Sequence, residues 1–180
     1  LNSFWIYSTL HSSYILDDKN IYNQAINYFN SLQKLLNNNI FHCYNKNRKE
    51  VDVFLEDYAY YCLLLVSIYE INKDETSLKK CSELLKQTWN FFYDEDNNLL
   101  QKNIKNSNDL FVKPIDVIDN NIPNGNSIFL LACIKIFNIT EDAFWKEKIE
   151  TLKKSSHSSI NNAYSQMFSY LKILDICDQN

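Results

Sequence analysis

Glycine and proline are nearly missing from this sequence, which has one Gly and two Pro among 180 residues. Such scarcity leaves few positions for the tight turns that an all-β sandwich or a βαβ fold requires, so the composition favours an all-α protein. Hydrophobic residues make up 46% of the chain and charged residues 22%, which is enough apolar surface for one packed domain.

Clustered positive charge and long apolar runs are missing as well. Arg occurs once, at Arg48, the Lys residues are scattered, and the net charge is −4, which excludes nucleic acid as an expected partner. The longest apolar stretches, around 62–66 and 128–134, fall far short of the roughly 20 residues of a membrane span. We therefore expect neither a nucleic-acid partner nor a membrane-spanning segment.

Motifs for metals, nucleotides and disulfides are also lacking. The three His are far apart, no HExxH or CxxC motif occurs, and a single Gly cannot form a glycine-rich phosphate loop, so we expect no metal and no cofactor. His42 and Cys43 are neighbours in sequence, a spacing that does not turn a nucleophile and its base toward one another. The odd set of cysteines predicts reduced, buried thiols and a cytoplasmic location. These cysteines are Cys43, Cys62, Cys81, Cys133 and Cys177.

Apolar spacing predicts seven helices that alternate between broad and narrow apolar faces. This alternation indicates stacked α-hairpins whose odd-numbered helices form an inner layer. The N-termini of the inner helices then share one rim, where free backbone N–H groups suit anionic and hydroxyl-rich ligands. Residues 94–122 are expected to form a long loop with a short extended pair, and loops of this length are usually functional or disordered. The expected helices cover 3–14, 20–36, 53–71, a fourth segment after a cap at Asp74, 126–138, a sixth segment capped by Thr140, and 160–176.

The segment 113–127 contains the one Gly and both Pro. Pro123 and Gly125 are expected to form a turn before the fifth helix, with Gly125 either at positive φ or closely approached by another group. One interpretation is purely structural, with Asn126 or Ser127 as the helix N-cap. A second interpretation adds a pocket at the rim. The polar side chains that would point into it are Asp116, Asp119 and Asn126.

Two adjacent acids, Glu56 and Asp57, open the third predicted helix. The helix dipole favours acids at this position, which is one explanation for them. Because the helix is apolar on nearly every side, a carboxyl group there needs a partner or a shifted pKa, and either would suit it for acid–base chemistry. Trp5 and Tyr58 lie near the same rim and are candidates for a wall that stacks on sugar rings.

Three of these segments resemble a known family. The run Phe54-Leu55-Glu56-Asp57-Tyr58-Ala59, followed by residues 110–113 and by Pro123-Asn124-Gly125-Asn126-Ser127, is similar to the YyaL-like thioredoxin-domain proteins, which include a spermatogenesis-associated member in animals. Where this chain has Pro123-Asn124-Gly125-Asn126-Ser127, the family usually has Pro-Ser-Gly-Asn-Ser. The resemblance implies a thioredoxin-like domain followed by an α/α toroid of the six-hairpin glycosidase type, with residues 1–180 as a partial, C-terminal piece of that toroid. Related toroids that hydrolyse or epimerise sugars keep their pocket at the N-terminal rim of the inner helices.

Two functions are compatible with this sequence. In the first, the chain is a carbohydrate-processing or carbohydrate-binding toroid, glycosidase-like or epimerase-like, whose partners are a small-molecule sugar and the remainder of the parent polypeptide. In the second, it is a non-catalytic scaffold or protein-interaction domain, and its acids are caps tied up by backbone N–H groups. The candidate catalytic residues are Glu56, Asp57 and Asp119; the candidates for substrate binding are Trp5, Tyr58, Lys113, Asp116, Asn126 and Ser127; Pro123 and Gly125 are expected to form a structural turn.

Overall fold

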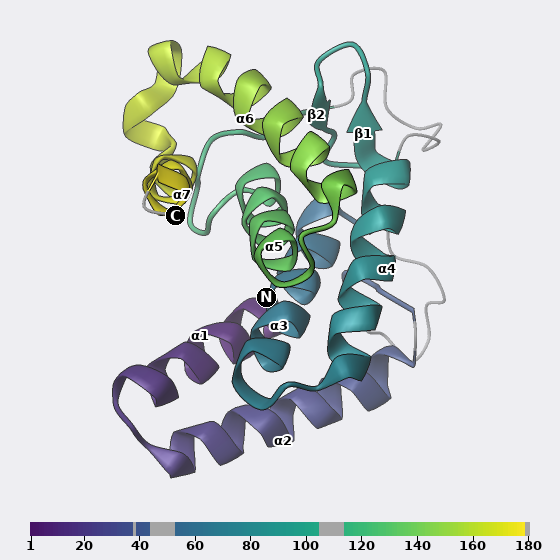
Figure 1. Ribbon diagram of the computed structural model, residues 1–180, viewed down its shortest axis with the longest axis vertical. Coiled ribbons are helices and arrows are strands. Elements are labelled where there is room, and N and C mark those ends of the chain that lie inside the picture. Colours follow the sequence, from purple (N-terminus) through teal and green to yellow (C-terminus); the bar gives the residue numbers. More distant parts are fainter. Residues whose placement is uncertain (38, 44–52, 105–113, 179–180) are drawn as a thin grey trace.

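The computed structural model describes residues 1–37, 39–43, 53–104 and 114–178, and these residues form seven α-helices, a short 3-10 helix and one two-stranded sheet (Figure 1). This confirms the all-α prediction. In chain order the elements are α1 (Asn2–Ile15), α2 (Lys19–Leu36), α3 (Leu55–Asn72), α4 (Glu75–Phe92), β1 (Tyr93–Asp94), β2 (Leu99–Leu100), α5 (Gly125–Thr140), α6 (Ala143–Ala163), η1 (Tyr164–Gln166) and α7 (Phe168–Asp178).

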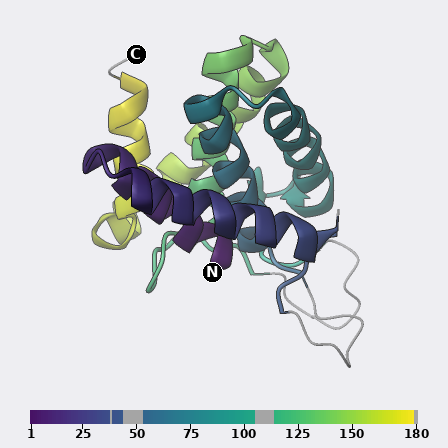
Figure 2. The ribbon, with the colours of Figure 1, turned by 90° about the horizontal axis from the view of Figure 1, so that it is seen from below.

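Consecutive helices pair into hairpins, and the odd-numbered helices form an inner layer. α1 packs against α2, α3 against α4, and α5 against α6, while α3 also packs against α1 and α5, and α5 against α7. Figure 1 shows α3 and α5 at the centre with α4 and α6 outside them. In Figure 2, turned by 90°, α2 runs across the near side of the molecule. The predicted stack of hairpins is therefore confirmed.

The sequence explains which helices lie inside. Twelve of the 18 residues of α3 are buried, because its apolar side chains cover every side of the helix. By contrast, α2 and α4 each bury a single stripe. Each of these two helices begins at an acid whose carboxylate accepts hydrogen bonds from first-turn N–H groups, Asp18 for α2 and Asp74 for α4, as predicted for Asp74.

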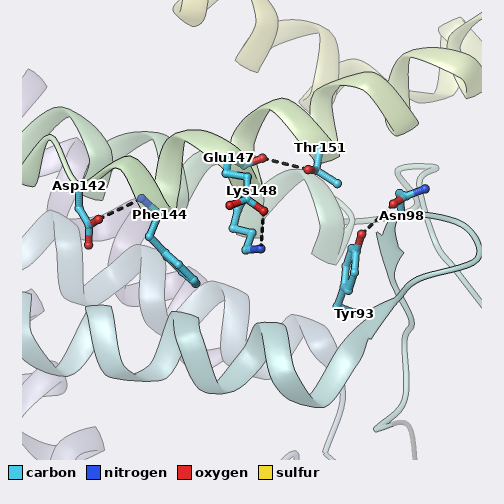
Figure 3. A network of polar contacts seen from close by, with 7 residues as sticks. All are labelled: Tyr93, Asn98, Asp142, Phe144, Glu147, Lys148 and Thr151. Atoms are coloured by element: carbon cyan, nitrogen blue, oxygen red, sulfur yellow. Dashed lines mark hydrogen bonds and ion pairs between the residues drawn. The ribbon is translucent and has the colours of Figure 1, made fainter.

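Two predicted helix ends are wrong. The cap of α6 is Asp142, whose carboxylate accepts from the Phe144 N–H at 3.0 Å (Figure 3). Thr140 ends α5 instead and donates its hydroxyl to the Ile136 carbonyl. A carboxylate is a stronger acceptor than a hydroxyl, and this shifts the start of the helix. The predicted helix over 160–176 is divided, because α6 continues to Ala163 and η1 separates it from α7.

The predicted extended pair after α4 is present. β1 and β2 pair antiparallel, with Tyr93 opposite Leu100, and the Tyr93 hydroxyl donates to the Asn98 side chain at 2.8 Å (Figure 3). After β2, the Lys102 carbonyl accepts from the Leu55 N–H at 2.9 Å. The sheet therefore carries the chain back across the N-terminal end of α3. Part of the predicted loop, including Lys113, lies outside the described residues.

α1 packs against α2 and α3 and buries Ile6 and Leu10. Several apolar side chains of α1 and its two caps stay exposed. They are Leu1, Trp5, Tyr14, Ile15 and Leu16. Among the described helices, none combines the length and apolarity needed to cross a bilayer.

Four cysteines have described surroundings, and all four are free thiols. Cys62, Cys81 and Cys133 are buried as predicted, and the Cys81 thiol donates to the Cys62 carbonyl at 3.3 Å. The prediction is wrong for Cys43, which is exposed because it lies in the segment after α2 and outside the helical stack.

Candidate functional site

The N-terminal ends of α1, α3 and α5 meet at one cleft, as expected for inner helices that share a rim. The cleft has a volume of about 550 Å³, and a smaller pocket of about 90 Å³ adjoins it through five common residues. These common residues are Leu1, His42, Glu56, Asp57 and Tyr60. The rest of the cleft is lined by Phe54, Lys102, Asp116, Ile118 and Asn120–Asn124.

Glu56 is the acid of this cleft that lacks a partner for one of its oxygens. Its Oε2 is buried and makes no hydrogen bond. Burial raises the pKa of Glu56, an effect that nearby Lys102 partly offsets and that Asp116 reinforces. A carboxyl group that keeps its proton above the usual range can donate that proton to a bound ligand, so Glu56 has the properties of a general acid.

The raised pKa of Glu56 predicts a pH-dependent effect of Glu56→Gln on stability. The folded state holds the proton from the ordinary pKa of 4.5 up to the raised value, so the stability that protonation provides is lost as pH rises through this interval. Gln stays neutral, so we expect the variant to be more stable than wild type at about pH 8 and equal to it at about pH 4. Urea unfolding at both pH values measures this difference. Exposed Glu95→Gln is the control, and an equal effect of Glu56→Gln at both pH values would contradict the prediction.

Asp57 is bound on both sides. One oxygen accepts from the Phe54 N–H at 2.9 Å, which caps α3, and both oxygens lie 3.1 Å from His42 Nδ1. His42 also packs edge-on against the Phe54 ring. Asp57 therefore orients the imidazole through Nδ1, which acts as the donor to the carboxylate, and leaves Nε2 available for a different partner.

The far wall of the cleft consists of the turn before α5, held against α3. Tyr60 donates its hydroxyl to the Pro123 carbonyl at 2.8 Å. A Cβ added to Gly125 would lie 2.9 Å from Leu55 Cγ and 3.3 Å from Glu56 Cγ, so the expected close approach is confirmed. The alternative of a positive φ at Gly125 is wrong.

The polar residues around Gly125 bind the protein itself. The N-cap of α5 is Asn124, whose side chain accepts from the Ser127 N–H at 2.9 Å, so the prediction of Asn126 or Ser127 as the cap is wrong. Asn126 is 3% exposed, accepts from the Leu100 N–H, and donates to the carbonyls of Leu100 and Asp116. This arrangement ties α5 to β2 and leaves Asn126 no free polar atom for a ligand.

Asp119 is separate from the cleft acids. Its Oδ1 accepts from the Asn124 N–H and side-chain amide, both at 2.9 Å, and its Oδ2 accepts from the Ser169 N–H at 2.7 Å. Both oxygens are occupied by donors of the protein, as in a structural anchor. The geometry favours this role over the catalytic one expected from the sequence.

Of the remaining predicted binding residues, Asp116 lines the cleft, whereas Tyr58 and Trp5 do not. Asp116 lines the cleft and pairs with Lys102 at 3.0 Å, whereas Tyr58 is buried against Phe91 and Phe92 between α3 and α4. Trp5 lines neither pocket, is 51% exposed, and packs on Tyr28 of α2. The cleft thus gathers three of the predicted residues, Glu56, Asp57 and Asp116. It adds His42, whose pairing with Cys43 was rejected on sequence spacing, and Lys102, which the sequence did not single out. Within the described residues no cluster of His, Cys, Asp or Glu could hold a metal ion.

Solved structures place this fold among the α/α toroids. The chain is similar to cellobiose 2-epimerase from Bacillus thermoamylovorans, at a TM-score of 0.57 and 14% identity, over 85% of this chain and 42% of that one. It is also similar to a family 88 glycosyl hydrolase from Bacteroides vulgatus, at a TM-score of 0.50 and 16% identity, again over 85% of this chain and 42% of that one. Neither protein-family models nor curated proteins yield a match to the sequence.

These similarities establish the fold class. The chain is a stack of α-hairpins with the fold of part of an α/α toroid, and it spans less than half the length of both neighbours. At this level of identity the likeness concerns the fold alone.

Proposed function

We propose that this chain belongs to a carbohydrate-processing toroid and binds a small-molecule sugar in the cleft at the rim of α1, α3 and α5. The observation that carries the proposal is Glu56, which has a buried carboxyl oxygen without a partner and a raised pKa. Its position at the N-termini of three inner helices adds backbone N–H groups that suit hydroxyl-rich ligands. The names of the two structural neighbours, an epimerase and a glycosyl hydrolase, agree with this ligand class.

In the proposed reaction Glu56 is the acid and His42 the base. Glu56 donates its proton to a sugar oxygen, and Nε2 of His42 accepts a proton from water or from the sugar while Asp57 holds the ring. Asp116 is neutralised by Lys102 at 3.0 Å, which places it in a binding role. Both hydrolysis and epimerisation need such an acid–base pair, so the cleft serves either reaction.

The test is saccharide binding and turnover with Glu56→Gln. We expect calorimetry with a panel of mono- and oligosaccharides, cellobiose included, to show saturable binding by wild type and by the variant, because Gln keeps the shape and neutrality of the protonated acid. Turnover of the bound sugar, followed by NMR, should fall roughly 10²- to 10⁴-fold in the variant.

Glu95→Gln, in the exposed turn between β1 and β2, is the matched control and should keep full activity. Wild-type turnover in Glu56→Gln would remove Glu56 from the reaction. A wild-type chain that binds no sugar of the panel would contradict the proposal as a whole.

The second candidate function is a scaffold or protein-interaction domain. The observation that favours it is the set of polar residues bound within the protein, since Asp119 and Asn126 use all their oxygens on backbone groups or Asn124. On the resemblance of 54–59 and 123–127 to YyaL-like proteins, we propose that the parent protein also carries a thioredoxin-like domain. On its unpaired cysteines we propose that it is cytoplasmic. The scaffold would present that domain to partners, and absence of sugar binding would favour it.

A further inference from the structure

The segment from Ile118 to Asn124 forms one wall of the cleft. Most of its residues line the cleft, but Asp119 does not. The position of this wall therefore depends on what holds the segment from behind. Asp119 is the residue of the segment that bonds to another element on that side.

Asp119 joins the wall to α7 by one contact and to η1 by another. Its carboxylate accepts from the Ser169 N–H at 2.7 Å in the first turn of α7, and its own N–H donates to the Gln166 carbonyl at 2.7 Å. The other carboxylate oxygen reaches Asn124, the N-cap of α5. A single side chain thus links the start of α7 to the start of α5. Hydrogen bonds to a charged acceptor are stronger than neutral ones, which makes this link a firm one.

The start of α7 is itself fixed in the core. Met167, Tyr170 and Ile173 are each at most 3% exposed. The Tyr170 hydroxyl donates to the Lys153 carbonyl of α6 at 2.7 Å. Because both partners of Asp119 belong to a packed junction of η1 and α7, the segment is held against a rigid support.

We infer that Asp119 is a positioning residue through which the η1–α7 junction sets the shape, and hence the ligand affinity, of the cleft. In this role Asp119 lies outside the lining of the cleft and takes no part in proton transfer. The effect on ligand affinity rests on the proposed sugar site, whereas the effect on the shape of the cleft does not. α7 therefore influences a site to which it contributes no lining residue.

The test cuts the link without changing Asp119. Ser169→Pro removes the backbone N–H from which Asp119 accepts, in the first turn of α7, where no intrahelical hydrogen bond is lost. Ser169→Ala keeps that N–H and is the matched control. Amide hydrogen exchange of Asp119 and Asn124, measured by NMR, should become roughly 10- to 100-fold faster in the proline variant. Exchange of Leu65, in the centre of α3, should not change. Cellobiose affinity should fall by a similar factor, with the pH profile of turnover unchanged.

Asp119→Asn is the second variant, because it removes one charge-assisted bond and leaves α7 intact. If Asp119 positions the wall, sugar affinity should weaken equally in Asp119→Asn and in Ser169→Pro. If Asp119 is catalytic, turnover should be lost in Asp119→Asn alone, and this result would overturn the inference. So would unchanged exchange at Asn124 in both variants, or faster exchange with unaltered affinity. If wild type binds no sugar, the proposed function fails, and the exchange result still decides whether α7 holds the wall.

Discussion

Replacing Asn126 by alanine is expected to lower the free energy of unfolding by roughly 2–5 kcal/mol. The substitution leaves the Leu100 N–H and the carbonyls of Leu100 and Asp116 without the partner that now bonds to them at 2.9–3.0 Å. Leu100 is fully buried, so water cannot replace the lost bonds without opening the contact between β2 and α5. Urea unfolding monitored by circular dichroism measures the change.

Asn97→Ala is the matched control, because Asn97 is exposed and binds only a neighbouring side chain of the β1–β2 turn. Its effect should stay within about 0.5 kcal/mol. If Asn126 serves a ligand instead, the alanine variant will keep its stability and lose binding, and that result would restore the role expected from the sequence.

Gly125→Ala is expected to destabilise the fold through overpacking. The new methyl group would lie 2.9 Å from Leu55 Cγ and 3.0 Å from Leu55 Cδ2, and Leu55 is only 2% exposed, so it has little room to move. Overpacking of this kind costs about 1–3 kcal/mol, against a gain of at most about 1 kcal/mol from the better helix propensity of alanine. Thermal and urea unfolding of the variant measure the balance.

A double-mutant cycle identifies the cause. Leu55→Ala removes the two atoms nearest to the new methyl group, so Gly125→Ala should cost much less in that background than in wild type. Equal costs in the two backgrounds would show that the strain lies elsewhere.

Much of the fold could be read from apolar periodicity. α3 has no polar side and α4 has one stripe behind a carboxylate cap, so their inner and outer positions follow from the chain alone. The predicted caps of α5 and α6 are wrong because several adjacent polar residues can each cap a helix. The choice of Asn124 depends on its side chain reaching Asp119 and Ser127, which local sequence does not reveal.

The candidate site was predictable only where one residue carried the signal. Glu56 could be found because a carboxyl group at the start of an all-apolar helix needs an explanation. His42 meets Asp57 across 15 residues of chain, and Ser169 meets Asp119 across 50, so neither contact has a local signature. Only the tertiary structure therefore shows that Glu56 keeps an oxygen without a partner while both oxygens of Asp119 are bound.

The uneven burial of the thiols provides an experimental tool. Burial raises the pKa of Cys62 and of Cys133, so both stay protonated and out of reach of alkylating reagents. Of the cysteines whose surroundings the structure describes, Cys43 is the one that a maleimide can reach in the folded protein. It follows His42 directly in the chain, so a fluorophore attached there would lie next to a residue that lines the cleft. The native sequence thus carries its own attachment point for an optical sensor of ligand entry.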